Sequence, residues 1–368
     1  MSHPTSTSTT HPTSRGEDTD HLAEVLQQLA NRMVRGTGVH GLLLGVESDD
    51  GSQNVCVAAG DARPDATYVI ASITKMFTSA VILQLVDEGR LRLDDRVVPL
   101  LPGLDLGGVH VRRGVDATDA LEVHHLLHQT SGLADYFDED FEVELARGED
   151  LAYSIQDTVD VARTAGAAFA PGDRGGRRSL YSDTNYQLLT AIIEAVTGQP
   201  YAQAVDERIV EPTGLLDTSV FGDANDLATP LVLRSGDQPL SIPQGIASER
   251  GAGGIVSTLA DQLRFSRAFH AGELFTGGLT RAAPHWNRVQ NFTIGYGHGV
   301  MRYRLPRWMT GRRVPEMFGH SGTTASFLFH VPELGCHVAG SFNQFADPAR
   351  PFRFLPRLVG TVAGARRA

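Results

Sequence analysis

The segment from Ser72 to Glu88 constrains the fold more than any other part of the sequence. It is predicted to form a helix that ends at Gly89. Apolar side chains are spread over nearly all of its circumference: Ile73, Met76, Phe77, Ala80, Val81, Ile82, Leu83, Leu85 and Val86. A helix with so little polar surface is stable only when other elements cover all of its sides. A chain of 368 residues is long enough to enclose it, so we expect this helix inside the molecule.

The segments with β-strand composition gather at the two ends of the chain. They cover residues 39–47 and 54–59 near the start, and 292–303, 314–318, 326–331 and 337–342 near the end. Helical patterns and long loops rich in Gly, Pro and Asp fill the middle. This arrangement predicts an α/β protein with one sheet built from both chain termini, flanked by helices, and a mostly helical insertion. The α/β part is expected at residues 21–90 and 290–368, and the helical part at 91–289.

Seven further segments carry the apolar spacing of amphipathic helices. They cover residues 21–35, 120–128, 154–164, 184–197, 201–209, 258–271 and 352–362. In the sixth of these, Thr258 is placed to cap the helix, and Asp261 follows three residues later as in a capping box.

The ends and the composition limit the classes of partner. Residues 1–20 have no apolar side chain beyond Met1 and are predicted to be a disordered tail. They lack the apolar core of a signal peptide, and no stretch reaches 18 apolar residues, so a cytoplasmic protein without a membrane partner is expected. The formal net charge of −11 argues against nucleic acid as a partner. Cys56 and Cys336 are expected as buried free thiols, and the oligomeric state stays open.

Lys75 is the single lysine of a chain with 31 arginines. Arginine and lysine substitute for each other on a solvated surface, but only the lysine amine can lose its proton when it is desolvated. A lone lysine in the first turn of the predicted buried helix is therefore a candidate for proton chemistry.

Ser72 and Lys75 are three residues apart, which places them on one face of the helix. The first turn of a helix has unpaired N–H groups and the positive end of the helix dipole, and both favour a negative oxygen at Ser72. A serine hydroxyl is a weak nucleophile that needs a neighbouring base, and burial lowers the pKa of a lysine amine. This S-x-x-K segment predicts nucleophilic catalysis by Ser72 with Lys75 as the base.

Two later segments carry groups that could complete such a site. Tyr181 precedes another predicted helix and could relay a proton between Lys75 and a leaving group. Residues 320–323 (HSGT) lie between two predicted strands. Gly322 allows a close approach of a strand edge to a substrate, and the N–H of its neighbour can complete an oxyanion hole.

In this order, the three segments resemble the motifs S-x-x-K, Y-x-N and K/H-T/S-G of the serine β-lactamase and penicillin-binding-protein superfamily. Residues 126–133 (LLHQTSGL) resemble the family's LLxHTSGL segment, and residues 251–258 (GAGGIVST) resemble its AGGxxST loop. The class C branch is the nearest match; it includes class C β-lactamases, D-alanyl-D-alanine carboxypeptidases, D-aminopeptidases, family VIII esterases and some acyltransferases. The resemblance extends over residues 22–360 and implies an antiparallel sheet in a β-lactamase/transpeptidase-like fold.

The resemblance also implies roles for the motif residues. Ser72 would be the acylated nucleophile, with Lys75 and Tyr181 as base and proton shuttle. The N–H groups of Ser72 and Thr323 would form the oxyanion hole. No metal or cofactor is implied.

Two substrate-binding positions depart from the family pattern. Asp183 stands in place of the Y-x-N asparagine; a carboxylate only accepts hydrogen bonds, and near Lys75 it would favour the ammonium and shift the base role towards Tyr181. His320 replaces lysine, and a mostly neutral imidazole is a poorer anchor for a carboxylate. His320 is still expected to line the pocket with Ser321 and Gly322. Together these departures favour an esterase or amidase over a β-lactamase.

Three other patterns are weaker. His124 and His128 are spaced as a zinc-binding pair on a helix, but no acidic third ligand follows at a motif distance. Residues 319–323 fail the G-x-S-x-G pattern of α/β-hydrolases at its fifth position. The acidic stretch at residues 135–150 is expected as a solvated loop or as a rim that attracts a substrate ammonium group.

The expected function is that of a serine hydrolase that forms an acyl-enzyme at Ser72 and cleaves an ester or amide bond of a small substrate, without a cofactor. A D-amino-acid peptidase or carboxypeptidase, and an acyltransferase of the same family, are the alternatives. A catalytically silent binding or sensor domain is the alternative from another class. The combination of Ser72, Lys75 and Tyr181 argues against it, because a binding domain does not need all three.

Overall fold

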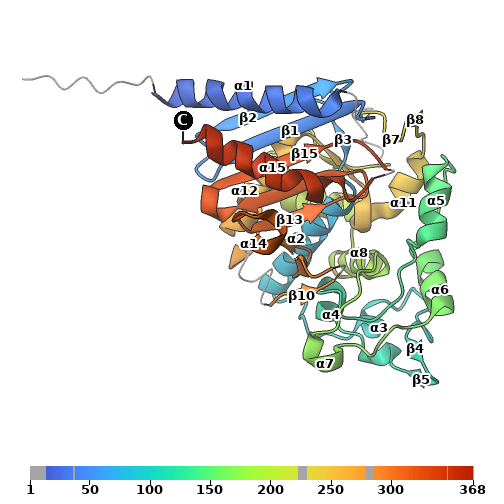
Figure 1. Ribbon diagram of the computed structural model, residues 1–368. Coiled ribbons are helices and arrows are strands. Elements are labelled where there is room, and N and C mark those ends of the chain that lie inside the picture. The colour runs from blue at the N-terminus through green and yellow to red at the C-terminus, as the bar shows by residue number, and fades with distance from the viewer. Residues whose placement is uncertain are drawn as a thin grey trace, which may run out of the picture.

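The computed structural model describes residues 14–35, 38–222, 230–278, 285–289, 291–345 and 347–367. Its main feature is an eight-stranded sheet with the strand order β10-β11-β12-β13-β14-β15-β1-β2, antiparallel throughout. The strands are β1 (Gly41–Ser48), β2 (Asn54–Gly60), β10 (Asn287–Arg288), β11 (Ile294–Tyr296), β12 (Met301–Tyr303), β13 (Met317–Ser321), β14 (Ser326–Val331) and β15 (Cys336–Ser341). Because β1 pairs with β15, the two ends of the chain share one sheet, as predicted (Figure 1).

Each face of the sheet is covered by helices. Helices α1 (Ser14–Val34) and α15 (Arg350–Ala365) cover one face, while α12 (Leu259–Ala271) packs on the other, where α2 (Thr74–Asp87) also lies (Figure 1). Strand β14 shows the alternation that this requires: Phe327 and Phe329 belong to the core under α1 and α15, and Leu328 belongs to the core around α2. The sheet is therefore the wall between two hydrophobic cores.

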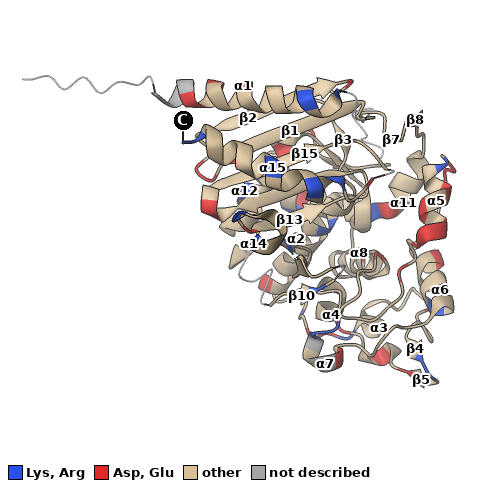
Figure 2. Cartoon of the chain, in the orientation of Figure 1, with Lys and Arg blue, Asp and Glu red and all other residues tan. Residues whose placement is uncertain are grey.

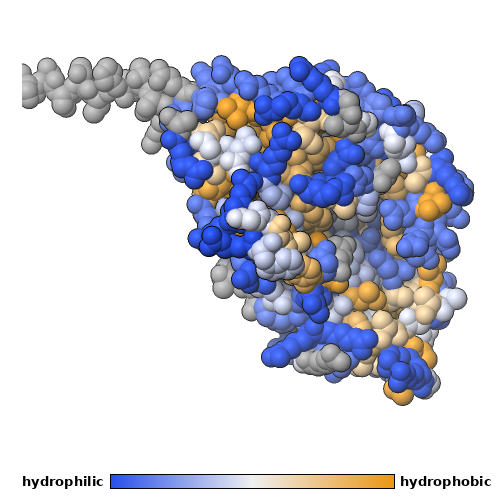
Figure 3. Space-filling model, in the orientation of Figure 1, coloured by the Kyte–Doolittle hydropathy of each residue, from blue (hydrophilic) through white to orange (hydrophobic). Residues whose placement is uncertain are grey.

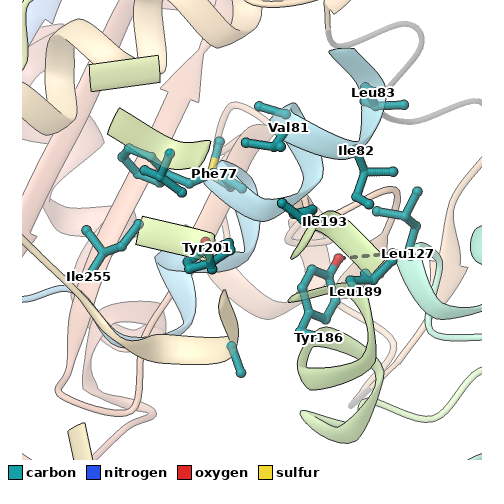
Figure 4. Packing of buried hydrophobic residues seen from close by; sticks show 14 of the residues in the cluster. Phe77, Val81, Ile82, Leu83, Leu127, Tyr186, Leu189, Ile193, Tyr201 and Ile255 are labelled. Carbon is teal, nitrogen blue, oxygen red and sulfur yellow. Dashed lines mark hydrogen bonds between the residues drawn. The ribbon is translucent and has the colours of Figure 1, made fainter. Parts of the chain in front are cut away.

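Helix α2 is buried as the sequence predicts. A 3₁₀ turn (η1, Ala71–Ile73) leads into it, and all its residues from Thr74 to Leu83 are buried. Figure 4 shows Phe77, Val81 and Ile82 of α2 packed among side chains from several other elements, including Ile193 of α8 (Thr184–Thr197). The Phe77 ring stacks on Phe265 of α12 with 3.6 Å between the ring centroids. The apolar circumference of α2 is thus matched by neighbours on each side.

The middle of the chain forms a mostly helical region beside the sheet (Figure 1). Its helices are α3 (Val97–Leu100), η2 (Thr118–Ala120), α4 (Val123–Leu127), α5 (Glu139–Ala146), α6 (Ile155–Ala165), α7 (Asp173–Gly176), α8, α9 (Tyr201–Val205), a π-helical turn (η3, Asp206–Val210), α10 (Glu211–Thr213) and α11 (Pro243–Gly253). The short strands β3 (Tyr68–Val69), β9 (Ile255–Ser257) and β6 (Ser219–Val220) form a second sheet. The remaining small elements are β4 (Val111–Arg112), β5 (Val115–Asp116), β7 (Arg234–Ser235), β8 (Gln238–Pro239), α14 (Arg307–Thr310) and η4 (Pro332–Leu334).

Three boundaries differ from the predictions. Residues 292–303 form two strands, β11 and β12, because the chain turns at Gly299, whose φ is +71° and where a Cβ would lie 2.5 Å from the Cβ of Ser79. Helix α1 starts at Ser14, inside the segment predicted to be a disordered tail, and the rest of that segment, residues 1–13, lies outside the described residues. Helix α12, assigned above to the helical part, packs against β1, β14 and β15.

The surface is mainly polar on the face that Figure 3 shows, and its hydrophobic residues form separate patches. Within the described residues, no helix is both long enough and apolar enough to cross a membrane. The two cysteines lie in strands as free thiols, Cys336 buried in β15 and Cys56 half-buried in β2.

Candidate active site

Ser72 lies in a sharp turn that the sheet holds in place. The preceding residue, Ala71, has a φ of +48°, a left-handed conformation that alanine rarely adopts. The hydroxyls of Thr324 and Ser326 donate hydrogen bonds to the carbonyls of Val69 (2.9 Å) and Ile70 (2.8 Å). These bonds hold the turn that carries Ser72 against the sheet. They fix the position of the Ser72 hydroxyl at the N-terminal end of α2.

Lys75 is fully buried behind Ser72. Its Nζ lies 3.0 Å from Oγ of Ser72, 2.6 Å from the carbonyl oxygen of Ala252 and 2.6 Å from Oδ1 of Asp183. The contacts with Ser72 and Ala252 are hydrogen bonds, and the contact with Asp183 is an ion pair. Asp183 therefore stands directly beside Lys75, as the sequence analysis expects.

Two further carboxyl groups lie behind this ion pair. The carboxylate of Asp135 accepts the N–H of Asp183 at 2.8 Å, and burial, then the charge of Asp183, raises the pKa of Asp135 well above its ordinary value. Burial, then the charge of Asp183, also raises the pKa of Glu249 in α11 to about 7. Tyr153 donates its hydroxyl proton to Glu249 at 2.5 Å. One lysine therefore faces three carboxyl groups, of which Asp183 contacts it directly.

The other side of Lys75 is lined by neutral rings. The Tyr181 phenol is hydrogen-bonded to Ser72, and Nζ of Lys75 lies 5.2 Å from the centre of its ring. Burial, then the negative charge of Asp183, raises the pKa of Tyr181 well above its ordinary value, so the phenol keeps its proton. Tyr181 is thus placed to relay a proton, but not to act as a phenolate base.

His320 is placed differently from the expectation. Its side chain is fully buried, with Nδ1 2.7 Å from the carbonyl of Ser321 and Nε2 3.3 Å from the hydroxyl of Tyr296. Burial, then the charge of Lys75, lowers the pKa of His320 to about 3, so it is neutral. The imidazole packs against the rings of Tyr181 and Tyr296 behind the site and is not among the residues that line the cleft.

The end of β13 forms the cleft wall opposite Ser72. A Cβ on Gly322 would lie 2.4 Å from Oγ of Ser326 and 2.6 Å from the carbonyl of Ile70, so no side chain fits there. Glycine therefore allows the strand end to pack against the turn that carries Ser72. Ser321, Gly322 and Thr323 line the cleft with Ser72, as predicted. The oxyanion hole formed by the N–H groups of Ser72 and Thr323 stays a prediction.

Two pockets meet at Ser72. The first has the apolar wall Phe137, Leu145, Leu233, Ile242 and Phe345, and its lining also includes Asp183 and Glu249. The second, about 900 Å³, is more polar and includes Asp135, Glu142, Tyr181 and Asn291. Neither lining contains a lysine or arginine among the described residues. The cleft therefore suits an apolar or cationic group better than an anion.

Sequence reasoning missed three partners of the site. Asp135 belongs to the acidic stretch, which was considered as a rim for a substrate ammonium, and α5 within that stretch is acidic (Figure 2). Glu249 and the carbonyl of Ala252 lie in or beside the AGGxxST segment. No spacing rule connects these residues to Lys75, because they reach it from other parts of the chain.

The spacing of His124 and His128, set aside above as a weak pattern, does not bring the two residues into one ligand group among the described residues. His124 instead lies with Glu122 and His125, whose ligand atoms are within 4.8 Å of one another. These groups already have partners: the N–H of Glu122 donates to Nδ1 of His125 at 3.1 Å, and the Glu122 carboxylate pairs with Arg96 at 3.0 Å. This cluster is explained by the capping of α4.

Comparison with known proteins places the chain in its family. Residues 26–358 match the Beta-lactamase family. Penicillin-binding protein 4 of Amycolatopsis lactamdurans is 29% identical over 324 residues, which cover 82% of this chain and 78% of that protein. Esterase EstB of Burkholderia gladioli is 33% identical over 162 residues, 42% of this chain and 38% of that protein. The chain spans 59% of penicillin-binding protein 4* of Bacillus subtilis, at 26% identity.

Solved structures agree with this assignment. A D-stereospecific amidohydrolase from Streptomyces sp. has a TM-score of 0.73 and 28% identity, covering 88% of this chain and 95% of that chain. A D-amino acid amidase from Ochrobactrum anthropi has a TM-score of 0.72 at 22% identity, covering 95% and 99%, and it supports the fold. The family match and the S-x-x-K serine and lysine in contact at the cleft lead to one conclusion: the chain belongs to the beta-lactamase family of serine hydrolases.

Proposed function

We propose that the protein is an acyl-enzyme-forming amidase or esterase whose substrate carries an apolar side chain and a free ammonium group, as an amino-acid amide does. The observation that carries this proposal is the composition of the first pocket. Its wall is apolar, and the carboxyl groups of Asp183 and Glu249 lie beside Ser72. The wall suits the side chain, and the carboxyl groups suit the ammonium group.

The charge balance of the cleft supports a cationic substrate over an anionic one. Lys75 is fully buried behind the cleft, where its Nζ donates to Ser72 and Ala252 and pairs with Asp183, so it is not free to bind a substrate carboxylate. Because the described cleft lining has carboxyl groups and no permanent cation, it offers no charged partner for a substrate carboxylate. Carboxypeptidase and β-lactamase substrates carry such a group, which makes an amidase or esterase the better fit.

In the proposed reaction, Oγ of Ser72 attacks the substrate carbonyl carbon. Its proton passes to Lys75 as Lys75 passes a proton to Asp183, so the buried pair becomes a lysine ammonium and a neutral carboxyl group. The N–H groups of Ser72 and Thr323 hold the oxyanion. Collapse breaks the bond to the leaving group, which receives a proton through Tyr181 as Asp183 returns its proton to Lys75. Water then repeats the sequence to release the acyl group and regenerate Ser72.

The comparisons supply the chemical class and one possible configuration. The relative from Streptomyces is named a D-stereospecific amidohydrolase, and a matching curated protein is named an esterase. These names support amide and ester bonds as the cleaved group. They also make a D-configured amino-acid amide the first substrate to test.

Covalent labelling separates an enzyme from a silent binding domain. A fluorophosphonate probe is expected to add one label to the wild-type chain and none to Ser72→Ala, measured by intact mass. An unlabelled wild type would contradict the acyl-enzyme and favour the binding domain.

A substrate panel tests the rest of the proposal. D- and L-phenylalanine amide, N-acetyl-D-phenylalanine amide, p-nitrophenyl esters and nitrocefin are compared by kcat/KM. We expect the free amine to exceed its N-acetyl form by at least about tenfold, because one well-placed charge contact is worth about 1.4 kcal/mol or more. Equal rates for the two forms would contradict the role given to the carboxyl groups.

A further inference from the structure

A second group of polar side chains lies on the α12 face of the sheet, away from the active site. His330 of β14 and His337 of β15 are directly opposed residues of neighbouring strands. Their rings stack with 4.4 Å between centroids. Asp49, in the turn after β1, places Oδ1 3.1 Å from Nε2 of His330 and 3.3 Å from Nε2 of His337. Three segments of the chain thus bring three metal-binding atoms together, all within 4.8 Å of one another.

The separations fit a small tetrahedral ion. Zinc binds imidazole nitrogen and carboxylate oxygen at about 2.0–2.2 Å, so neighbouring ligand atoms in a tetrahedral site lie roughly 3.3–3.5 Å apart. The two distances from Asp49 are close to this value, and the two stacked rings have to tilt for both Nε2 atoms to point at one ion. Two imidazoles and one carboxylate are also the donor set that borderline divalent ions prefer over Ca²⁺ or Mg²⁺.

Oδ1 of Asp49 already faces both imidazoles. It is hydrogen-bonded to Nε2 of His330 at 3.1 Å, and an ion at this place would replace that contact. The neighbouring cation Arg267 is paired with Glu47 at 3.2 Å, which offsets its charge.

A second layer of contacts orients His337. Its Nδ1 lies 2.8 Å from the hydroxyl of Ser266 in α12. Nδ1 of His270 lies 2.8 Å from the Ser266 carbonyl and donates to it, so the Ser266 hydroxyl is available to His337. When Nδ1 of His337 donates to this hydroxyl, the lone pair of Nε2 faces Asp49, as in metal sites where an outer partner fixes the histidine tautomer.

Access distinguishes this group from a closed core cluster. The side chain of His337 is 2% exposed and that of His330 is 14% exposed, whereas the carboxylate of Asp49 is 48% exposed. An ion can enter from the side of Asp49, and water can fill a fourth position there. The cluster of Glu122, His124 and His125 is less suited to an ion. Nδ1 of His125 already accepts a backbone N–H, and the Glu122 carboxylate already pairs with Arg96.

We propose that Asp49, His330 and His337 form a binding site for Zn²⁺ or a similar imidazole-preferring divalent ion. The ion joins the turn after β1 to the β14–β15 hairpin. His330 is four residues along β14 from Ser326, about 13 Å of strand, so the site stabilises the sheet and takes no part in the reaction at Ser72.

The test uses the untagged full-length chain after removal of metal with EDTA. Zn²⁺ binding is measured by calorimetry, Co²⁺ binding by the visible absorption of tetrahedral cobalt, and stability by the melting temperature. We expect binding of Zn²⁺ at this site and a rise in melting temperature of about 3–6 °C at a hundredfold excess over Kd. Wild-type protein that binds neither ion would overturn the proposal.

Variants locate the ion. Asp49→Asn and His330→Asn should each weaken Zn²⁺ binding by at least about tenfold, and Ser266→Ala by about 10–100-fold, the usual range for an outer partner. His40→Asn is the matched control, because His40 also contacts an aspartate, Asp237 at 2.9 Å, but has no second histidine; it should bind as wild type does. Undiminished binding in Asp49→Asn and His330→Asn, or loss of binding in His124→Asn instead, would overturn the assignment. Asp49 is half exposed, so its variant is the one expected to fold normally.

Discussion

The two sides of Lys75 are both buried, yet they differ in charge. One side consists of carboxyl groups, with Asp183 in contact and Asp135 and Glu249 behind it. The other side consists of neutral groups, including Tyr181 and His320. Burial pushes a titratable group towards its neutral form unless an opposite charge touches it. The contrast is that Asp183 touches the Lys75 amine, whereas burial pushes the groups farther away on both sides towards their neutral forms.

The two sides also come from different parts of the fold. The acidic groups are supplied by the helical region, through the loop before α5, the start of α8 and helix α11. On the neutral side, Tyr296 and His320 are supplied by strands β11 and β13. The site therefore lies at the interface between the sheet and the helical region. Lys75, at the start of α2, lies between groups from both.

The largest effect should come from removing the proton chemistry of Lys75 itself. Lys75→Arg keeps the positive charge opposite Asp183, but a guanidinium does not give up a proton. We expect kcat/KM to fall by at least about 10²-fold, the usual contribution of a positioned base. Lys75→Met, which also removes the charge, should be no more active. Near-normal turnover by Lys75→Arg would show that a positive charge at this position is sufficient for catalysis. Lys75 would then have no role in proton transfer.

Asp183→Asn replaces the carboxyl group that touches Lys75 with a neutral amide, so that both sides of Lys75 then present neutral groups in contact with it. The amide keeps the size of the side chain, removes the charge 2.6 Å from Lys75, and restores the asparagine of the family motif. We expect the preference for free-amine over N-acetyl substrates, taken as the ratio of their kcat/KM values, to fall by at least about tenfold, while both rates fall because the variant lacks the proposed proton acceptor for Lys75. Glu139→Gln, an exposed change of the same kind on α5, is the control and should leave both unchanged. An unchanged preference in Asp183→Asn would count against a role of Asp183 in selecting the substrate.

Glu249→Gln tests the acidic side through stability. The pKa of Glu249 is about 7 in the folded protein, against an ordinary value of 4.5. As pH rises from 4.5 to 7, the unfolded chain loses this proton before the folded chain does, so the stability of the wild type falls in that window. The variant lacks this loss, and its stability relative to wild type should increase between pH 4.5 and pH 7, by at most about 3 kcal/mol.

The measurement is denaturant unfolding of Glu249→Gln and wild type at pH 5 and pH 8. Glu139→Gln again serves as the control and should show no such change. A difference between variant and wild type that is the same at both pH values would show that Glu249 does not keep its proton on folding.

The smallest effect is expected on the neutral side. His320 stays neutral above about pH 3, so it supplies no ionisation to the reaction near neutral pH. His320→Asn should lower kcat by less than about tenfold and leave the shape of the pH–rate profile between pH 5 and 8 unchanged. Loss of an ionisation near pH 6–7 in this variant would show that His320 titrates, and would remove the distinction between the two sides.

Several features could be predicted from the local sequence pattern. Helix α8 has the bounds predicted for it, and Thr258 caps α12 as expected, by accepting the N–H of Asp261. The pairing of Ser72 with Lys75 also follows from spacing along one helical turn. Such features depend on residues a few positions apart, which the sequence displays directly.

Other features needed contacts between distant segments. Helix α11 was not predicted, because its three glycines weaken the helical pattern; Gly251 is required where a Cβ would lie 2.3 Å from Oγ1 of Thr190. The division of residues 292–303 into β11 and β12 depends on the close packing of Gly299 on Ser79. The burial of His320 likewise follows from the rings that surround it, and not from its motif.

The sequence alone predicted that the Ser72 hydroxyl meets the Lys75 amine, since the two residues lie three positions apart at the start of a helical segment that has to be buried. Only the tertiary structure decided the electrostatic setting of that amine. The number of carboxyl groups near Lys75, and which of them touches it, depends on distances between segments that are far apart in the chain. Electrostatic energy varies with those distances and with the exclusion of water, and neither can be read from residue order.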